Sequence, residues 1–262
     1  MNFKHKKSLG QNFLIDRNVL DHIVSIVDIS GKNVLEIGPG SGNLTTYILK
    51  KNPKKVYVVE KDDDLAVLLH NQFNNEIEII NKDILDINED KISDEQLIVF
   101  GNLPYNISTE ILSKWIINMS TNFWFESLLL MFQKEVADRI IAESNTSKYG
   151  RLSILSNWKL NIKKIMDIGP QSFSPRPKVD STLLLFTPKK KIFKLKSAKN
   201  LEMITRVFFS QRRKMLKKPF NQIFHNSKKV SEKFDINLNL RPQNLEAEMY
   251  FKLVKEYEDL QC

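Results

Sequence analysis

The glycine-rich turn at residues 38–42 constrains the fold of this 262-residue chain more than any other segment. The turn, Gly38-Pro39-Gly40-Ser41-Gly42, follows an apolar run at 33–37 and precedes an amphipathic segment at 43–51. Glycine has no Cβ, so its backbone can adopt positive φ and can approach a ligand closely. A buried strand, such a turn and then a helix predict the first unit of an open α/β sheet with a ligand at its edge.

The pattern of the first 188 residues predicts the rest of that sheet. Apolar runs predict strands at 33–37, 55–59, 77–80, 97–100 and 127–132. Amphipathic segments predict helices at 43–51, 63–73, 109–119 and 134–143. This alternation is typical of a mainly parallel sheet with helices on both faces. A further helix at 151–160 and a late strand at 181–186 follow, and the pattern is compatible with an antiparallel final hairpin.

The character of the sequence changes near residue 190. Helix-like segments at 201–209, 212–218 and 246–258 follow, and no strand pattern lies between them. We therefore expect two domains: a sheet-containing domain at 1–188 and a small all-helical domain at 189–262.

Charge and cysteine content narrow the functional classes. The chain carries 40 Lys and Arg against 31 Asp and Glu, a net charge of +9, which favours polyanionic partners. The chain is also rich in Lys, Asn and Ile, as AT-rich coding produces, and such coding would explain the positive charge without a polyanionic partner. Composition alone therefore does not decide whether the protein binds nucleic acid. The single cysteine, Cys262, excludes an intramolecular disulfide and a Cys-based zinc site and favours a reducing compartment. The four histidines show no ligand spacing, so we expect no metal site.

No segment resembles a secretory signal or a membrane span. The amino terminus has positive charge but no apolar segment behind it. The most apolar stretch, 123–132, is too short to cross a bilayer and contains Glu126. These features predict a cytoplasmic protein without membrane contact.

Polar residues follow the predicted strands and should converge on one edge of the sheet. Glu60 follows the second strand and is suited to accept hydrogen bonds from the hydroxyls of a ribose. Asp83 follows the third strand and could accept from an adenine amine. The glycine spacing is G-x-G-x-G, whereas dinucleotide sites prefer G-x-G-x-x-G. A dinucleotide and S-adenosylmethionine both remain compatible with this edge, although acidic residues favour the cationic sulfonium of the latter.

The turn Asn102-Leu103-Pro104-Tyr105 follows the fourth strand and suggests how a base could be held. The Asn102 side-chain oxygen and the Leu103 carbonyl could accept the two N–H bonds of an adenine amine. Such bonds would favour a more tetrahedral nitrogen, whose lone pair could attack an electrophile. Tyr105 would stack on the ring. A tight polar turn with no ligand is the common alternative for an Asn-x-Pro segment.

Seven segments resemble those of one enzyme family, in order and over nearly the whole chain. The chain is similar to the KsgA-type small-subunit ribosomal RNA adenine dimethyltransferases. The segments that resemble them are Ser8–Leu14, Glu36–Gly40, Asn102–Tyr105, Gln133–Ala137, Phe173–Ser181, Gln211–Leu216 and Arg241–Leu245.

The resemblance implies a Rossmann-like, S-adenosylmethionine-dependent methyltransferase sheet and a helical RNA-binding domain. It implies transfer of four methyl groups to two adjacent adenosines in the 3′-terminal hairpin of small-subunit rRNA, within a pre-ribosomal particle. Residues expected to contact the cofactor or its pocket are Asn12, Leu14, Gly38, Glu60, Asp83 and Asn102. Asn102, Leu103, Pro104 and Tyr105 would hold the target adenine, and Phe173 would stack on its other face. We expect the protein to act as a monomer.

Basic stretches are by default solvated surfaces, but with an RNA substrate they predict phosphate contacts. The residues expected to make these contacts are Lys6, Lys7, Lys189, Lys190, Lys191, Arg212, Arg213, Lys214, Lys217 and Lys218.

Three other functions fit parts of the pattern. A large-subunit adenine methyltransferase of the antibiotic-resistance type would share the glycine turn and a similar N-P-Y turn. A non-catalytic ribosome-assembly or transcription factor could be built on the same scaffold, and an assembly role could also coexist with catalysis. A nicotinamide oxidoreductase would use the same sheet edge.

Overall fold

The computed structural model describes residues 12–119 and 122–261, and the chain divides into two compact units. The first unit comprises Met1–Lys114, Ser120–Ala137 and Ile162–Pro188, and the second comprises Trp115–Met119, Asp138–Asn161 and Lys189–Cys262. The border between Pro188 and Lys189 lies where the sequence predicts a domain boundary. The second unit also takes two earlier segments, which the sequence did not indicate.

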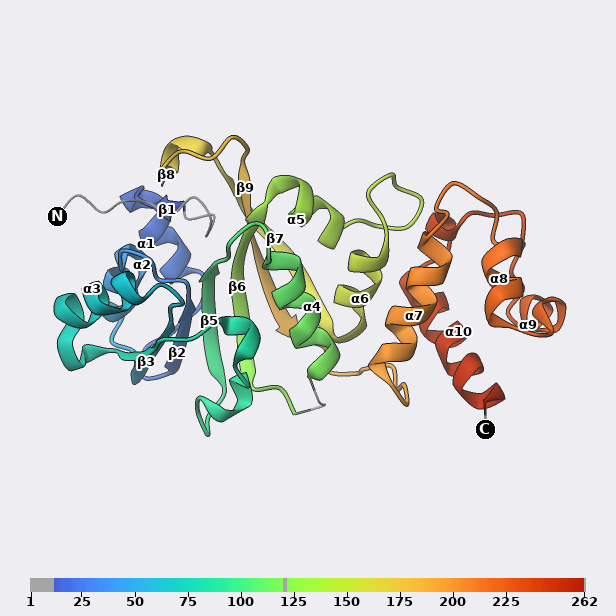
Figure 1. Ribbon diagram of the computed structural model, residues 1–262, viewed down its shortest axis with the longest axis horizontal. Helices are drawn as coiled ribbons and strands as arrows, with labels where there is room; N and C mark the ends of the chain where they lie inside the picture. The colour runs from blue at the N-terminus through green and yellow to red at the C-terminus, as the bar shows by residue number, and fades with distance from the viewer. Residues whose placement is uncertain (1–11, 120–121, 262) are drawn as a thin grey trace. The chain divides into compact units, whose positions relative to one another are not determined.

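A seven-stranded sheet in the order β4-β3-β2-β5-β6-β9-β7 forms the centre of the α/β fold (Figure 1). The strands are β2 (Asn33–Ile37), β3 (Lys55–Val59), β4 (Glu78–Ile80), β5 (Leu97–Asn102), β6 (Phe125–Gln133), β7 (Leu160–Ile168) and β9 (Ser181–Pro188). The first five strands in this order, β4 to β6, pair in parallel with their neighbours, whereas β9 pairs antiparallel with β6. Two further short strands, β1 (Phe13–Leu14) and β8 (Phe173–Ser174), pair antiparallel with each other.

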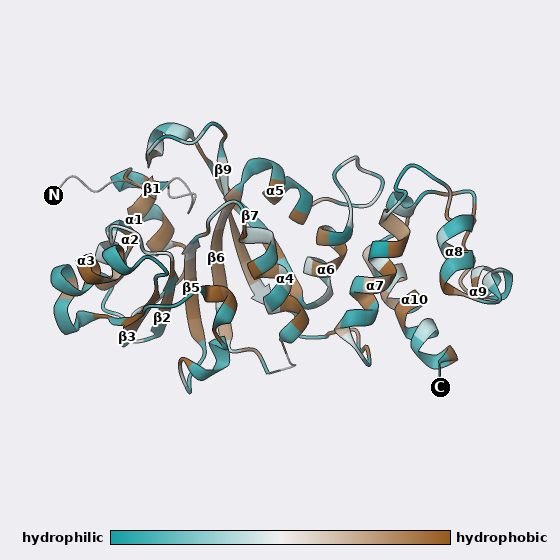
Figure 2. Cartoon of the chain, in the orientation of Figure 1, coloured by the Kyte–Doolittle hydropathy of each residue, from teal (hydrophilic) through white to brown (hydrophobic). Residues whose placement is uncertain are grey.

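The central strands are continuously apolar because both faces of the sheet are covered. All five residues of β2 are buried, and the first five of β5 are as well. Figure 2 shows the same strands as hydrophobic ribbons between amphipathic helices. Parallel strands of this kind require crossover helices on the sheet faces.

Aspartate side chains cap two of the helices that flank the sheet. Asp16 caps α1 by accepting hydrogen bonds from the N–H groups of Asn18 and Val19, and Asp62 caps α3 in the same way at Asp64. The helices that follow the strands are α1 (Arg17–Ser25), α2 (Asn43–Leu49), α3 (Asp63–Phe73), α4 (Ser108–Asn118) and α5 (Lys134–Ile140).

The second unit is helical around an aromatic core. Its helices are α6 (Arg151–Lys159), α7 (Ala198–Phe209), α8 (Lys217–Ile223), α9 (Ser227–Lys233) and α10 (Ala247–Leu260). Helices α6, α7 and α10 pack against one another. The Phe208 ring lies 5.5 Å from Tyr250 and 5.4 Å from Phe220, and the buried Tyr250 hydroxyl donates to the Pro242 carbonyl at 2.7 Å.

Most predicted elements are confirmed within a few residues, and the antiparallel pairing of the late strand is confirmed as well. The helix predicted at 212–218 is wrong in its first half, because residues 210–213 form turns and α8 begins only at Lys217. There the N–H groups of Leu216 and Lys217 donate to the carbonyls of Leu240 and Leu238, so contacts distant in sequence set the conformation.

The sequence analysis missed α1, α9, β1, β7 and β8. Strand β7 is last in the sheet order and mostly not buried, so it lacks the apolar run that identified the inner strands.

Candidate active site

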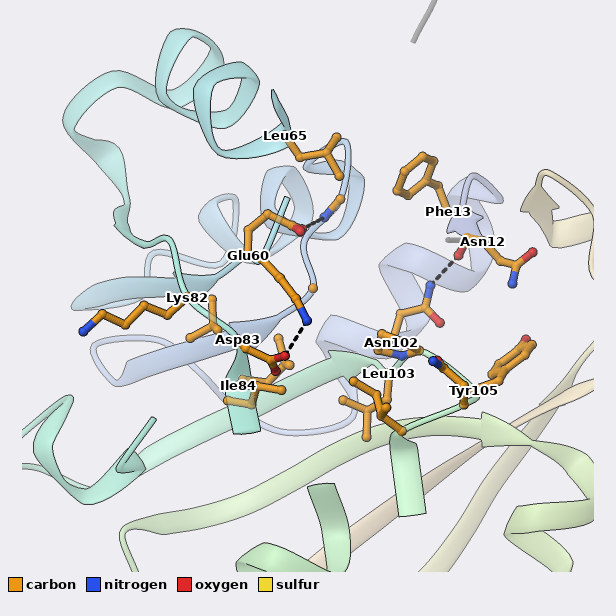
Figure 3. A pocket seen from close by; sticks show the side chains of 18 residues that line it. Asn12, Phe13, Glu60, Leu65, Lys82, Asp83, Ile84, Asn102, Leu103 and Tyr105 are labelled. Atoms are coloured by element: carbon orange, nitrogen blue, oxygen red, sulfur yellow. Dashed lines mark hydrogen bonds and ion pairs between the residues drawn. The ribbon is translucent and has the colours of Figure 1, made fainter. Parts of the chain in front are cut away.

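A pocket lies at the carboxyl ends of β2, β3, β4 and β5, where the sequence predicted a ligand (Figure 3). Each of these strands contributes a polar or glycine residue at its end, and the N-terminal segment closes one side. Its lining includes Asn12, Phe13, Gly38, Gly40, Glu60, Lys61, Asp83, Ile84, Asn102, Leu103, Pro104 and Tyr105. The structure therefore brings five of the six predicted cofactor residues together with the whole 102–105 turn.

The N–H groups of the three glycines in the turn all have acceptors within the protein. Gly38 N donates to Val59 O at 2.9 Å, Gly40 N to Glu60 Oε2 at 3.2 Å, and Gly42 N to Pro39 O at 2.9 Å. All three glycines have positive φ, which side chains rarely adopt. A Cβ on Gly40 would lie 2.4 Å from a ring carbon of Phe13. Because these three N–H groups already have acceptors, they are not available to a pyrophosphate, and a cofactor without phosphates fits the turn better.

Glu60 is a buried carboxylate at the pocket wall. Only 7% of the residue is exposed, and its second oxygen accepts from Asp62 N at 2.9 Å. Desolvation by burial raises the pKa of Glu60 above its ordinary value, against the opposing effect of these backbone hydrogen bonds. The two N–H bonds orient both oxygens, each of which has a further lone pair for a ribose hydroxyl.

Asp83 lies across the pocket from the glycine turn. Its Oδ2 is 2.6 Å from Lys61 Nζ, and its Oδ1 accepts from Leu85 N at 3.0 Å. The hydrogen bond from Lys61 lowers the pKa of Asp83, so the carboxylate is ionised at neutral pH. An ionised acceptor at this position fits an adenine amine, which would share Asp83 with Lys61.

The Asn102 side chain is oriented by the N-terminal segment. Its Nδ2 donates to the Asn12 backbone carbonyl at 2.7 Å (Figure 3). Because the amide nitrogen is engaged there, the amide oxygen remains as the acceptor end of the group. Tyr105 is oriented in a similar way, since its hydroxyl lies 2.6 Å from the Oγ of the buried Ser181. Burial raises the pKa of Tyr105, so the phenol stays neutral.

Phe173 and Leu14 do not lie where the sequence analysis expected them. Phe173 is only 3% exposed and belongs to the hydrophobic core, where it pairs with Leu14 across β1 and β8. Neither residue lines the pocket. The expectation that Phe173 stacks on the target base is therefore not supported by the position of its side chain in this structure.

The basic residues predicted to contact RNA differ in their surroundings. Lys6 and Lys7 lie outside the described residues. Lys189 is half-buried and its ammonium group donates to the Asn157 carbonyl, and Arg212 donates to the Thr146 carbonyl at 3.3 Å. The remaining predicted residues are exposed: Lys190, Lys191, Arg213, Lys214, Lys217 and Lys218. The last four line a surface depression of the second unit.

The sequence analysis assigned no role to three residues near the site. Phe13 lies in the segment that resembles the family, but its contact with the glycine turn depends on folding. Glu36 is 2% exposed and accepts from Thr45 Oγ1 at 2.6 Å, and burial raises its pKa to about 8. Ser181 is distant in sequence from its partner Tyr105, so no local pattern could have identified it.

Residues 12–119 and 122–261 contain neither a metal-binding cluster nor a membrane-spanning helix. No group of three or more His, Cys, Asp or Glu side chains there could hold a metal ion. No helix in the same ranges has the length and apolar character needed to span a bilayer.

The sheet order, the glycine turn bonded to Glu60 and the acids at the strand ends are those of an S-adenosylmethionine-dependent methyltransferase. The model of the ribosomal RNA adenine dimethylase family matches residues 2–259. The chain is 77% identical to "Ribosomal RNA small subunit methyltransferase A" of Pelagibacter ubique, and the alignment covers 98% of each chain. It is 43% identical to the protein of that name from a Wolbachia strain, and that alignment covers 99% of this chain and 96% of the relative. It therefore belongs to the ribosomal RNA adenine dimethylase family and is an enzyme that dimethylates adenine in rRNA.

Solved structures agree with this assignment. A dimethyladenosine transferase from Plasmodium falciparum matches with a TM-score of 0.81 and 27% identity, covering 94% of this chain and 98% of that chain. The 23S rRNA methyltransferase ErmE matches with a TM-score of 0.69 and 22% identity, covering 95% and 100%, which supports the fold alone.

Proposed function

We propose that the protein dimethylates two adjacent adenosines in the 3′-terminal hairpin of small-subunit rRNA, in a pre-ribosomal particle. The names of the relatives support the small subunit as the target, and the 77% identity over nearly the full length supports the same reaction. The proposal includes action in the cytoplasm and as a monomer. The single cysteine favours a reducing compartment and so supports the cytoplasm.

The orientation of the Asn102 amide carries this proposal. With its nitrogen donating to Asn12, the amide presents its oxygen as an acceptor for the amine of a target adenine. The adjoining Leu103 and Pro104 line the same pocket, and Tyr105 offers a ring that Ser181 holds in place. The adenine must leave its RNA stack to reach these groups, as in other enzymes that act on bases.

S-adenosylmethionine, when bound, supplies an electrophilic methyl group on its sulfonium. Glu60 and Asp83 would hold its ribose and adenine, as their positions at the ends of β3 and β4 allow. Asn102 would draw the target amine toward a tetrahedral geometry and aim its lone pair. The methylated amine is acidic and loses its proton to water, and a neutral amide at Asn102 does not retain the cation. Positioning and electrostatics therefore supply most of the catalysis.

The exposed basic residues of the second unit are proposed to contact RNA phosphates. Arg213, Lys214, Lys217 and Lys218 lie around one depression, and each is exposed. Contacts of this kind position an RNA without reading its sequence. The fixed contacts of Lys189 and Arg212 make these two residues weaker candidates.

A methylation assay tests the proposed target. The protein is incubated with labelled S-adenosylmethionine and, in parallel, with under-methylated small subunits, mature small subunits and large subunits. We expect label only in the under-methylated small subunits, as dimethyladenosine at two adjacent positions. Label in large-subunit RNA would instead favour the antibiotic-resistance type of enzyme, and no label in any particle would favour a non-catalytic assembly factor.

A further inference from the structure

A lysine behind the pocket connects the two segments that form its adenine-binding wall and its catalytic turn. Lys114 lies on α4, and its Nζ contacts three acceptors on one other segment. These are Ile84 O at 2.9 Å, Ile87 O at 2.6 Å and Glu89 Oε1 at 2.9 Å. An ammonium group has three N–H donors, so these acceptors use its full capacity.

The acceptor segment includes part of the pocket wall. Asp83 and Ile84 both line the pocket, and Asp83 starts a short 3₁₀ turn by accepting from Leu85 N. The Ile84 carbonyl therefore belongs to the same turn as the carboxylate that faces the cofactor site. A hydrogen bond to the Ile84 carbonyl therefore also helps to fix the position of Asp83 relative to the pocket.

The donor helix continues directly from the catalytic turn. The N–H groups of Ile107 and Ser108 donate to Pro104 O at 3.1 and 3.0 Å, and α4 starts at Ser108. Helix α4 is thus a rigid extension of the 102–105 turn. Lys114 projects from this extension to the segment that carries Asp83.

The contact is shielded from water. The side chain of Lys114 is 20% exposed and that of Glu89 is 7% exposed. Ion pairs in such surroundings are screened less than surface pairs, and their hydrogen bonds have a fixed geometry. Nearby surface lysines such as Lys91, which is exposed, have no comparable role in this wall.

We propose that Lys114 is a positioning residue for the cofactor: it holds the 83–87 segment at the distance from the catalytic turn that the nucleoside requires. This proposal rests on the proposed function only in taking the pocket as the S-adenosylmethionine site. Lys114 does not line the pocket. Its removal should therefore weaken cofactor binding through Asp83 and Ile84, while the amide of Asn102 keeps its own anchor at Asn12.

The experiment compares Lys114→Met with Lys91→Met, a matched change at an exposed lysine in the next 3₁₀ turn, Glu89–Lys91. The Kd for S-adenosylhomocysteine is measured by calorimetry, without RNA, well below the Tm of each variant. We expect Lys114→Met to raise this Kd about tenfold, the equivalent of one displaced hydrogen bond at the adenine. We expect Lys91→Met to leave it unchanged. Binding of wild-type strength in folded Lys114→Met would overturn the proposal, whatever the RNA target proves to be.

A kinetic measurement separates positioning from general stability. With labelled cofactor and small subunits, Lys114→Met should raise the KM for S-adenosylmethionine while kcat at saturation stays within about threefold of wild type. A purely structural role predicts a lower Tm with unchanged KM, and that result would contradict the proposal.

A second variant guards against a folding failure. Lys114→Met leaves the buried Glu89 carboxylate without this ammonium, which is destabilising. The double variant Glu89→Gln with Lys114→Met removes that charge but still deprives the Ile84 and Ile87 carbonyls of their donor. We expect the double variant to be as weak in cofactor binding as Lys114→Met. If its Kd returns to the wild-type value, the buried charge of Glu89 and not the position of the segment explains the defect, and the proposal fails.

Discussion

Replacement of Glu60 by glutamine should weaken cofactor binding with little loss of stability. In the structure the two carboxylate oxygens accept from Asp62 N at 2.9 Å and from Gly40 N at 3.2 Å. Glutamine has one oxygen, so its NH₂ group would face one of these N–H donors and could no longer accept from one ribose hydroxyl. A hydrogen bond to a charged group contributes about 1.5–3 kcal/mol. The expected increase in Kd is therefore about 10- to 150-fold.

The effect on folding should be smaller because two contributions oppose each other. The variant loses one backbone hydrogen bond, but it also removes the cost of burying a carboxylate whose pKa is raised by desolvation. Calorimetric titration with S-adenosylhomocysteine measures the effect on cofactor binding. Glu78→Gln is the matched control, since Glu78 pairs with Lys55 at the exposed start of β4. A Kd within twofold of wild type, or an equal loss in Glu78→Gln, would refute the assignment of Glu60 to the ribose.

Three further outcomes follow from the structure. Burial raises the pKa of Glu36 from 4.5 to about 8, so the native state retains a proton that the unfolded state releases. This contribution to the free energy of unfolding is complete below about pH 4.5 and is lost as the pH rises to 8. Urea unfolding at several pH values should show this extra pH dependence in wild type but not in Glu36→Gln. Ser181→Ala removes the partner of the Tyr105 hydroxyl, so the single-turnover rate constant of methyl transfer should fall about tenfold with unchanged cofactor Kd. A wild-type rate would argue against this anchor. The double substitution of Arg213 and Lys214 by alanine should reduce the slope of log K against log salt for RNA binding by about 1 to 2, whereas an unchanged slope would remove both residues from the interface.

The sheet edge was predictable because local sequence determines it. A glycine turn after a buried strand, and polar residues directly after three further strands, place Gly38, Glu60, Asp83 and Asn102 at one edge once the strands are parallel. Hydrophobic periodicity identified those strands, and parallel pairing of the strands required no information beyond the alternating helices.

Contacts between distant segments could not be predicted in this way. Lys114 and Ile84 are 30 residues apart, and Tyr105 and Ser181 are 76 apart, so neither pair leaves a local pattern. The expected stacking role of Phe173 came from a resemblance, whereas the structure buries this side chain in the core. The helix predicted at 212–218 was wrong for a related reason, because backbone bonds to 238–240 determine where α8 begins.

The central claim is that the Asn102 amide oxygen activates an extruded adenine, and one variant tests it directly. Asn102→Ala is compared with wild type in single-turnover methyl transfer to under-methylated small subunits, with the Kd for S-adenosylhomocysteine measured on the same preparations. We predict a rate about 10²- to 10³-fold lower, as for removal of other groups that stabilise a transition state, with a Kd raised by no more than about fivefold. A near-normal rate, or a loss of rate that follows entirely from lost cofactor binding, would contradict the account.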